Sequence, residues 1–246
     1  MINKLKKIIP NGIKAYYWRY LKQKEKDAKK RIKFDDKTPK DTFTFIYETN
    51  YWSGRDSISG GGSDLAHTQV LIKQLPILLK EIHIKSILDI PCGDFFWMHH
   101  ADLSNINYMG GDIVDSLIER NIEKYYSIEN VQFKVMDLLV DSLPQCDILI
   151  NRDCLVHLSF DDIYKALKNI KNSNCEYLLT TTFPNHTINK DITTGEWRTL
   201  NLEMAPFNFP SPIKSINEEF KHPEFGDKTL ALWRISDINL NNFKQL

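Results

Sequence analysis

Cysteine is sparse in this sequence, and long apolar runs are absent. The four cysteines, Cys92, Cys146, Cys154 and Cys175, include no C-x-x-C pair, a pattern that favours reduced thiols in a cytoplasmic protein. No apolar stretch approaches the roughly 20 residues that a membrane-spanning helix needs. The N-terminal apolar runs are too short and broken for a secretory signal. We therefore expect a cytoplasmic location.

Glycine is scarce at the point where a dinucleotide site would need it. Ser86–Met98 reads SILDIPCGDFFWM, an apolar run that breaks at Pro91 and Gly93, as a strand does before a nucleotide-binding turn. The dinucleotide fingerprint G-x-G-x-x-G requires more glycines than this turn has. The Gly/Ser-rich stretch Tyr51–Ser63 likewise lacks the Lys-Ser/Thr ending of a P-loop. The sequence predicts a site for a single nucleoside, and a nicotinamide-dependent reductase is the weaker alternative.

An excess of either charge is also missing, because 32 Lys and Arg residues balance 32 Asp and Glu residues. The balance is not local: Met1–Lys33 has 12 basic and two acidic residues, a net charge of +10, and the remainder has a net charge of −10. An acidic body argues against nucleic acid as the main substrate. Lys14–Lys33 is compatible with a basic, aromatic helix that either makes peripheral contact with an anionic membrane or serves as a tether. We expect residues 1–40 to form a helical extension and linker, and residues 41–246 to form a single domain.

From Ile84 onward, short apolar strands alternate with helical stretches. The expected strands are Ser86–Ile90, Asn107–Ile113, Val131–Met136, Cys146–Asn151, Glu176–Thr182 and Thr229–Ile235, and the expected helices are Leu65–Ile82, Ser116–Tyr126 and Phe160–Asn172. Strands that are separated by helices predict an α/β fold with a doubly wound, mostly parallel sheet.

Acidic residues stand at successive strand ends of this predicted sheet. Asp89, Asp112 and Asp137 belong to the ends of the first three strands, and Asp112 lies about 20 residues beyond Gly93. Ligands of doubly wound sheets bind at the carboxyl ends of the strands, where an acid can accept hydrogen bonds from ribose hydroxyls. Three acids in three such places are better explained as ligand contacts than as helix caps or turn residues.

Four segments together resemble the successive motifs of class I S-adenosylmethionine-dependent methyltransferases. They are Ile87–Phe95 (ILDIPCGDF), Gly111–Asp112, Val135–Leu138 (VMDL) and Ile150–Leu158 (INRDCLVHL). The resemblance covers about residues 84–182. It implies a Rossmann-like, seven-stranded sheet with an antiparallel last strand, and S-adenosylmethionine as the cofactor. Pro91 departs from the family's pattern, in which a glycine is common at that position.

The resemblance also assigns the strand ends to parts of the cofactor. Asp89 and Gly93 would line its methionine and ribose portions, and Asp112 would hold the ribose diol. Asp137 would accept a hydrogen bond from the adenine amino group, and Arg152 would lie beside the sulfonium. The expected cofactor-binding residues are Trp52, Arg55, Ser63, Asp89, Pro91, Cys92, Gly93, Asp94, Trp97, Asp112, Ile113, Asp137, Leu138 and Arg152.

A wider resemblance concerns the acceptor. Tyr51–Ser63, Thr180–Phe183 and Asp191–Phe209 look like segments of small methyltransferases from bacterial surface-polysaccharide gene clusters. We expect an insertion at about residues 183–212 that binds a sugar through polar and aromatic side chains; the alternative is an ordinary hydrated insertion. The expected substrate-binding residues are Thr182, Phe183, Asp191, Trp197, Arg198, Asn201, Glu203 and Asn208.

Methyl transfer to a sugar hydroxyl is expected to need a general base, because a hydroxyl is a weak nucleophile. His157 lies just past the fourth strand, and an imidazole accepts protons near neutral pH. If Asp153–Leu158 is helical, Asp153 shares a face with His157 and orients the imidazole. Asp153 could instead contact cofactor or substrate. The sequence suggests no metal site.

The function predicted from the sequence is therefore O-methylation of a sugar, in a sugar nucleotide or a glycan, during surface-polysaccharide synthesis. One alternative is methylation of a nitrogen or phosphate-type group in the same pathway. Another is a cofactor-binding module without turnover. The expected partner is a small-molecule or carbohydrate substrate, and the sequence does not distinguish a monomer from a homodimer.

Overall fold

The computed structural model describes residues 34–243, and the chain divides into the units Met1–Asp36 and Lys37–Leu246. All elements discussed below belong to the second unit. The helix predicted at Lys14–Lys33 and its membrane contact lie outside the described residues. Among residues 34–243, none of the helices combines the length and the apolar character needed to cross a bilayer.

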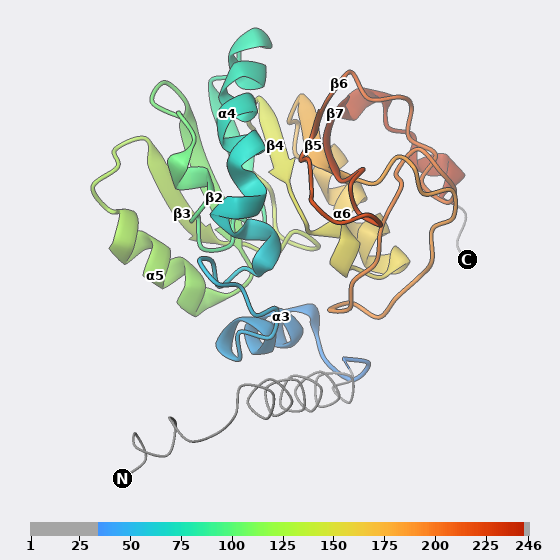
Figure 1. Cartoon of the computed structure of the whole chain (residues 1–246), viewed down its shortest axis with the longest axis horizontal. Helices are drawn as coiled ribbons and strands as arrows, with labels where there is room; N and C mark the ends of the chain where they lie inside the picture. The colour runs from blue at the N-terminus through green and yellow to red at the C-terminus, as the bar shows by residue number, and fades with distance from the viewer. Residues whose placement is uncertain (1–33, 244–246) are drawn as a thin grey trace, which may run out of the picture. The chain divides into compact units, whose positions relative to one another are not determined.

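Within the described part of the chain, seven strands form one sheet in the order β3-β2-β1-β4-β5-β7-β6 (Figure 1). β1 to β5 run parallel, and β7 runs antiparallel to both β5 and β6. The doubly wound, mostly parallel sheet and its antiparallel last strand are therefore confirmed. The strands are β1 (Ser86–Asp89), β2 (Asn107–Asp112), β3 (Val131–Val135), β4 (Ile148–Asn151), β5 (Tyr177–Thr182), β6 (Lys214–Asn217) and β7 (Thr229–Arg234).

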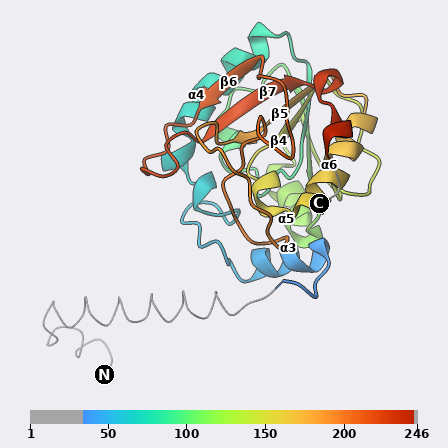
Figure 2. The same cartoon turned by 90° about the vertical axis from the view of Figure 1, so that its right-hand side faces the viewer.

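Helices cover both faces of the sheet, so the side chains of its central strands are buried on both faces. Ile148 and Ile150 of β4 belong to the core beneath α4, and Leu149 between them belongs to the core beneath α6. Figure 2 shows α4 and α6 on opposite sides of the strands. The helices are α3 (Pro39–Glu48), α4 (Leu65–Glu81), α5 (Asp115–Tyr125) and α6 (Phe160–Asn172).

α3 is not among the helices predicted from the sequence. The hydroxyl of Thr38 accepts a hydrogen bond from the Asp41 N–H at 3.1 Å, and Pro39 occupies the first turn, where a missing N–H costs little. The helix is ten residues long and carries aromatic side chains on several sides, so its period is hard to read in the sequence. Helix α3 is part of the candidate site, because its side chains form part of the wall of a pocket.

The predicted insertion separates β5 from β6 and contains no helix or strand within residues 183–213. It is nonetheless packed on the body, since Leu200, Leu202 and Phe207 are buried. β6 follows it and was missed by the sequence pattern. Only Ile216 of its four residues is apolar and buried, as is common for a short edge strand.

Candidate active site

A pocket opens at the carboxyl ends of β1, β2 and β4, where ligands bind in doubly wound sheets. Its empty volume is about 1130 Å³, including space open to solvent, and this suffices for a small molecule of cofactor size. Residues that follow β1 to β4 form its floor. The wall is completed by the stretch Trp52–Ser63 and by four residues of α3, which are Pro39, Phe43, Ile46 and Tyr47. We call it the strand-end pocket.

Nearly all of the cofactor-binding residues predicted from the sequence line the strand-end pocket. They are Trp52, Ser63, Asp89, Pro91, Cys92, Gly93, Asp94, Trp97, Asp112, Ile113, Asp137, Leu138 and Arg152. Asp153 and His157, the predicted catalytic residues, line the same pocket. Arg55 is the exception, because its side chain is exposed and lies outside the wall. Its backbone N–H donates to Asp64 at 3.0 Å.

The Gly/Ser segment, residues 52–64, is fastened to the turn after β1 by one acid. Asp94 accepts hydrogen bonds from the Ser57 hydroxyl at 2.8 Å, the Ile58 N–H at 3.0 Å and the Ser59 hydroxyl at 3.2 Å. These bonds use most of the acceptor capacity of the carboxylate. Asp94 therefore shapes the pocket wall mainly by fixing this segment.

Gly93 is required by its backbone conformation and by its neighbour. Its φ is +54°, and a Cβ built on it would lie 2.3 Å from the Ser59 hydroxyl. Because Gly93 has no side chain, the Gly/Ser segment can pack directly against its backbone. The Gly93 carbonyl accepts from the Asn121 side chain at 2.7 Å, which fixes the turn from the α5 side. The Ile90–Pro91 peptide bond before it is cis.

Three carboxyl groups at successive strand ends face the pocket and are partly or fully desolvated. Burial raises the pKa of Asp89 to about 7, although the Tyr108 hydroxyl donates to it at 2.6 Å. Burial raises the pKa of Asp112 to about 6 and also raises the pKa of Asp137. Asp112 accepts from the N–H groups of Gly93 and Val114, at 3.2 and 3.1 Å. Each oxygen keeps a lone pair for another donor, so the pocket suits a ligand rich in N–H and O–H groups.

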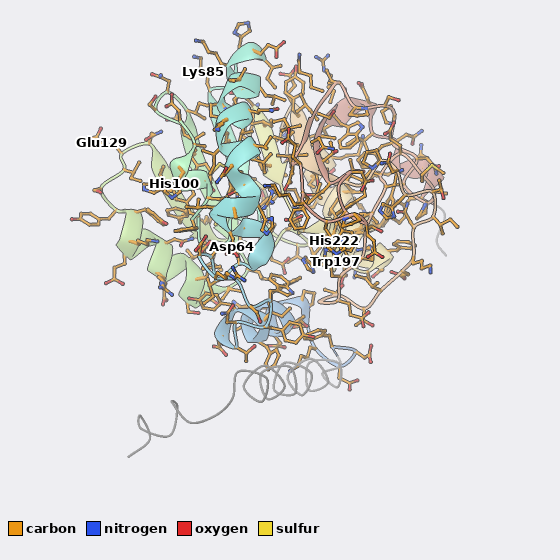
Figure 3. All side chains as sticks on the ribbon, viewed as in Figure 1. Asp64, Lys85, His100, Glu129, Trp197 and His222 are labelled. Atoms are coloured by element: carbon orange, nitrogen blue, oxygen red, sulfur yellow. The ribbon has the colours of Figure 1, made fainter. Side chains whose placement is uncertain are left out.

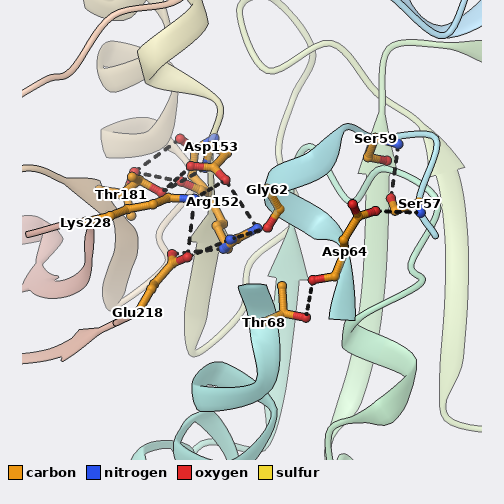
Figure 4. Close-up of polar contacts among 12 residues, drawn as sticks. Ser57, Ser59, Gly62, Asp64, Thr68, Arg152, Asp153, Thr181, Glu218 and Lys228 are labelled. Atoms are coloured by element: carbon orange, nitrogen blue, oxygen red, sulfur yellow. Dashed lines mark hydrogen bonds and ion pairs between the residues drawn. The ribbon is translucent and has the colours of Figure 1, made fainter. Parts of the chain in front are cut away.

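Four charged side chains form a largely buried cluster just past β4 (Figure 4), and two of them, Arg152 and Asp153, line the strand-end pocket. Arg152 donates to Glu218 at 2.6 and 3.0 Å, and Lys228 contacts Asp153 at 2.5 Å and Glu218 at 3.3 Å. Arg152 also donates to the Gly62 carbonyl at 2.8 Å, which ties the Gly/Ser segment to the cluster. Two cations and two anions leave the cluster with no formal net charge. Sequence reasoning missed its members near β6 and β7, because only the folded sheet brings them to β4.

Asp153 is ionised within this cluster. Burial alone would raise its pKa, but the charges of Arg152 and Lys228 outweigh burial and hold the pKa well below its usual range. The backbone of Asp153 has a φ of +52°, and a 3-10 turn follows at Leu155–His157. Asp153–Leu158 is therefore not one continuous helix, the condition on which orientation of the imidazole by Asp153 depended, and no hydrogen bond joins Asp153 to the imidazole.

His157 is oriented by a different group. Its Nδ1 lies 2.8 Å from the Glu196 carbonyl oxygen. A carbonyl can only accept, so Nδ1 carries the proton and Nε2 carries the free lone pair. The ring stacks on Trp52 with centroids 4.4 Å apart. Burial lowers the pKa of His157 to about 4, and the Glu196 bond and the Asp153 charge oppose this only in part. The imidazole is therefore neutral at physiological pH.

The eight predicted substrate-binding residues do not line the strand-end pocket, and most hold the insertion in place. Thr182 bonds to the backbone of Leu200 and Leu202, and Phe183 is buried in the core. The Asn201 side chain donates to two carbonyls, and Asp191 accepts from the Phe160 N–H at the start of α6. These side chains satisfy backbone groups that a coil would otherwise leave unpaired.

Asp191, Trp197 and Asn208 are the predicted substrate residues that are exposed, and Glu203 is half-buried. Trp197 is 44% exposed, and Asn208 donates only to the Pro206 carbonyl. Trp197 contacts Phe225 edge-on with centroids 5.0 Å apart, and His222 stacks on Phe225 at 4.6 Å. Figure 3 labels Trp197 and His222 next to each other in this view.

Arg198 was predicted to bind substrate, and its surroundings contradict that role. It is 8% exposed, and its guanidinium donates to the carbonyls of Lys190, Leu155 and Leu158 at 3.2, 2.8 and 2.7 Å. Burial lowers its pKa to about 10. The planar fork of arginine is used here to join the insertion to the 3-10 turn that carries His157.

We expect Arg198→Ala to lower the free energy of unfolding by about 3 kcal/mol, because it leaves buried carbonyls without donors. Arg234→Ala is the matched control, since Arg234 makes only exposed contacts and its loss should cost less than about 1 kcal/mol. Urea unfolding followed by circular dichroism measures both. If the Arg198→Ala protein is as stable as the wild type, Arg198 does not stabilise the fold, and a role in substrate binding would again be open.

Comparison with known proteins identifies the fold. No protein-family model matches the chain, and no curated protein matches it. Phosphoethanolamine N-methyltransferase 1 from Haemonchus contortus, solved with phosphoethanolamine and S-adenosylhomocysteine, aligns with a TM-score of 0.55 at 13% identity, over 84% of this chain and 53% of that chain. The methyltransferase domain of bacterial CtHen1-C aligns with a TM-score of 0.51 at 16% identity, over 70% and 98%. N-methyltransferase NodS from Bradyrhizobium japonicum WM9 aligns with a TM-score of 0.50 at 13% identity, over 69% and 93%.

These likenesses concern architecture. The chain spans about half the length of several of the matched structures, the Haemonchus enzyme among them. With the strand order and the strand-end pocket, they show that the chain has the Rossmann-like α/β fold of solved class I methyltransferases.

Proposed function

We propose that the strand-end pocket binds S-adenosylmethionine and that the protein transfers its methyl group to a hydroxyl oxygen. One observation carries the proposal: Asp89, Asp112 and Asp137 stand at successive strand ends around a single pocket, with His157 in the same wall. The shared fold with solved methyltransferases supports it.

The donor and acceptor chemistry of the wall fits this cofactor. Asp112 has free lone pairs for the two ribose hydroxyls. Asp137 accepts from the Leu139 N–H at 2.8 Å and keeps an oxygen for the adenine amino group, between the apolar side chains of Ile113 and Leu138. Asp89 would accept from the cationic amino group of the methionine portion. That group would favour the ionised carboxylate and lower its pKa.

The charged cluster matters because S-adenosylmethionine supplies a methyl group on a positively charged sulfur. A lone arginine at the end of β4 would repel such a ligand. Glu218 and Asp153 balance the charges of Arg152 and Lys228, so the wall keeps a fixed geometry without a net positive charge. The protein's contribution is then mainly to position donor and acceptor.

His157 is the proposed general base. The Glu196 carbonyl fixes its tautomer, so Nε2 accepts the acceptor's hydroxyl proton as the new bond forms. The imidazolium that results is stabilised by the nearby carboxylate of Asp153, whose charge raises the pKa of His157. Asp153 thus acts through its charge, and Glu196 provides the orientation that Asp153 was predicted to give.

We expect kcat to stay nearly constant between pH 8 and pH 5.5. The neutral imidazole is the active form, and burial lowers the pKa of His157 to about 4, so activity is lost only as the pH falls towards that value. An ordinary histidine with a pKa near 6.5 would lose about tenfold over this range. The rates should be measured at saturating S-adenosylmethionine, so that protonation of Asp89 or Asp112 in the free pocket does not enter. A tenfold loss by pH 5.5 would contradict this assignment.

A carbohydrate is the acceptor class that we propose. The sequence resemblance to polysaccharide methyltransferases supports it, and so does the half-exposed Trp197, because aromatic faces bind sugar rings. The residues around Trp197 bond to the turn that carries His157, with Gly195 N–H donating to the His157 carbonyl at 2.8 Å. Thr182, Arg198 and Asn201 give no support to this acceptor, since their side chains hydrogen-bond to the backbone.

Calorimetric titration tests the cofactor assignment without any acceptor. S-adenosylhomocysteine and S-adenosylmethionine should bind to the purified chain with one-to-one stoichiometry, and the nicotinamide dinucleotides should not. Binding of a nicotinamide dinucleotide in preference to S-adenosylhomocysteine would replace the proposal with a reductase.

A further inference from the structure

A second cavity lies near the amino ends of the strands, at the opposite end from the strand-end pocket. Its empty volume is about 540 Å³, including open solvent, and its walls come from the starts of β1 and β2 and from the residues just before β4. Ser86, Asn107, Gln132 and Cys146 are among its lining residues. None of them belongs to the strand-end pocket, so the cavity is separate from the proposed methyl-transfer site.

Cys146 is paired with another thiol at this end of the sheet. Cys146 and Cys175 each precede their strand by two residues, and the register of β4 and β5 pairs Ile148 with Tyr177. The two cysteines therefore stand opposite each other, and their Sγ atoms lie 2.8 Å apart. A disulfide bond is about 2.05 Å long, so bond formation needs a shift of less than about 1 Å.

The surroundings of the pair favour reaction at these two thiols. Cys146 Sγ also contacts the Ile148 carbonyl at 3.2 Å, and Cys175 Sγ contacts the Pro144 carbonyl at 3.5 Å, so both side chains are held in place. The hydrogen bond between the two thiols lowers the pKa of Cys175 and, together with burial, raises the pKa of Cys146, so Cys175 is the thiol that carries the thiolate, the reactive form. Burial raises the pKa of the other two thiols, Cys92 and Cys154.

We propose that Cys146 and Cys175 form an intramolecular disulfide when the protein meets a small two-electron oxidant such as hydrogen peroxide. The second cavity gives the oxidant access to the pair through Cys146. One thiolate attacks a peroxide oxygen, breaks the O–O bond and becomes a sulfenic acid, with release of one water. The other sulfur then attacks the sulfenic sulfur and releases a second water. Two thiols are oxidised and one peroxide is reduced.

The bond would join the amino ends of β4 and β5, far from their carboxyl ends at the strand-end pocket. The cross-linked residues are 29 positions apart, and closing a loop of this size restricts the unfolded chain. The oxidised protein should therefore melt about 5–10 °C higher than the reduced protein. Ligand binding at the strand-end pocket should not change.

Thiol accounting on the full-length protein tests the proposal. The reduced protein is treated with hydrogen peroxide, denatured and alkylated, and its intact mass and tryptic peptides are measured. Two of the four thiols should resist alkylation, and the cross-linked peptide should contain Cys146 and Cys175. Addition of a phosphine reductant should restore all four.

Two variants act as matched controls for the cross-link. Cys175→Ser should form no intramolecular disulfide and show no rise in melting temperature after peroxide treatment. Cys154→Ser, used here only for thiol accounting, should still form the Cys146–Cys175 bond. Four alkylatable thiols after treatment, a bond that includes Cys92 or Cys154, or oxidation of single thiols to sulfinic acid would each overturn the proposal. These outcomes do not depend on methyl transfer.

Discussion

Replacing His157 with asparagine should lower the rate of methyl transfer by about 100- to 10,000-fold, the range expected for loss of a general base. Asparagine can still donate a hydrogen bond towards the Glu196 carbonyl, but it has no basic nitrogen. Calorimetry should find S-adenosylmethionine bound about as tightly as by the wild type, because the acids at the strand ends are unchanged. The rate is measured as formation of S-adenosylhomocysteine at saturating acceptor.

The control for this variant is His100→Ala. His100 is exposed, contacts Phe96 edge-on and does not line the strand-end pocket, so its removal should leave the rate within about twofold of the wild type. A His157→Asn protein with nearly normal turnover would exclude the imidazole as the base. That result would favour an acceptor that needs little help, such as an amine.

Removing the carboxylate of Asp112 should weaken S-adenosylmethionine binding by about 100- to 1,000-fold. Two hydrogen bonds from ribose hydroxyls to a charged acceptor account for a loss of this size, at roughly 1.5–2 kcal/mol each. Asp112→Asn is the better variant, because its amide oxygen still accepts from one of the Gly93 and Val114 N–H groups and it removes a carboxyl group whose pKa burial raises to about 6. Calorimetric titration measures the loss directly.

Asp102→Ala is the matched control, since Asp102 is an exposed acid whose hydrogen bonds go to Ser104. It should bind the cofactor as the wild type does. Melting curves of both variants establish that they are folded. If folded Asp112→Asn binds with wild-type affinity, the ribose does not lie at the end of β2, and the orientation proposed for the cofactor is wrong.

The fold and the position of the pocket were predictable because both depend on local patterns. Apolar strands that alternate with helical stretches specify a parallel sheet, and the polar residue at the end of each strand then falls at one edge. Asp89, Asp112 and Asp137 reach the same pocket for this reason alone. The apolar spacing of α4 also gave its buried face, and Leu71 and Leu75 are fully buried there.

Other parts of the site depend on contacts between distant segments, which no local pattern reveals. Glu218 and Lys228 are 66 and 75 residues from their partners at the end of β4. Arginine is a common substrate-binding residue, but the guanidinium of Arg198 donates to backbone carbonyls that have no partner in a helix or sheet. The orientation of His157 came from the Glu196 carbonyl, and every residue has a carbonyl, so the sequence held no sign of it.

The most direct test of the proposed function is a crystal structure of the protein with S-adenosylhomocysteine. We predict that the adenine lies between Ile113 and Leu138 with its amino group at Asp137. The ribose diol should lie on Asp112, and the sulfur on the side of the pocket that holds Asp153 and His157. A ligand whose sulfur lies away from His157, or whose ribose does not reach Asp112, would contradict this prediction.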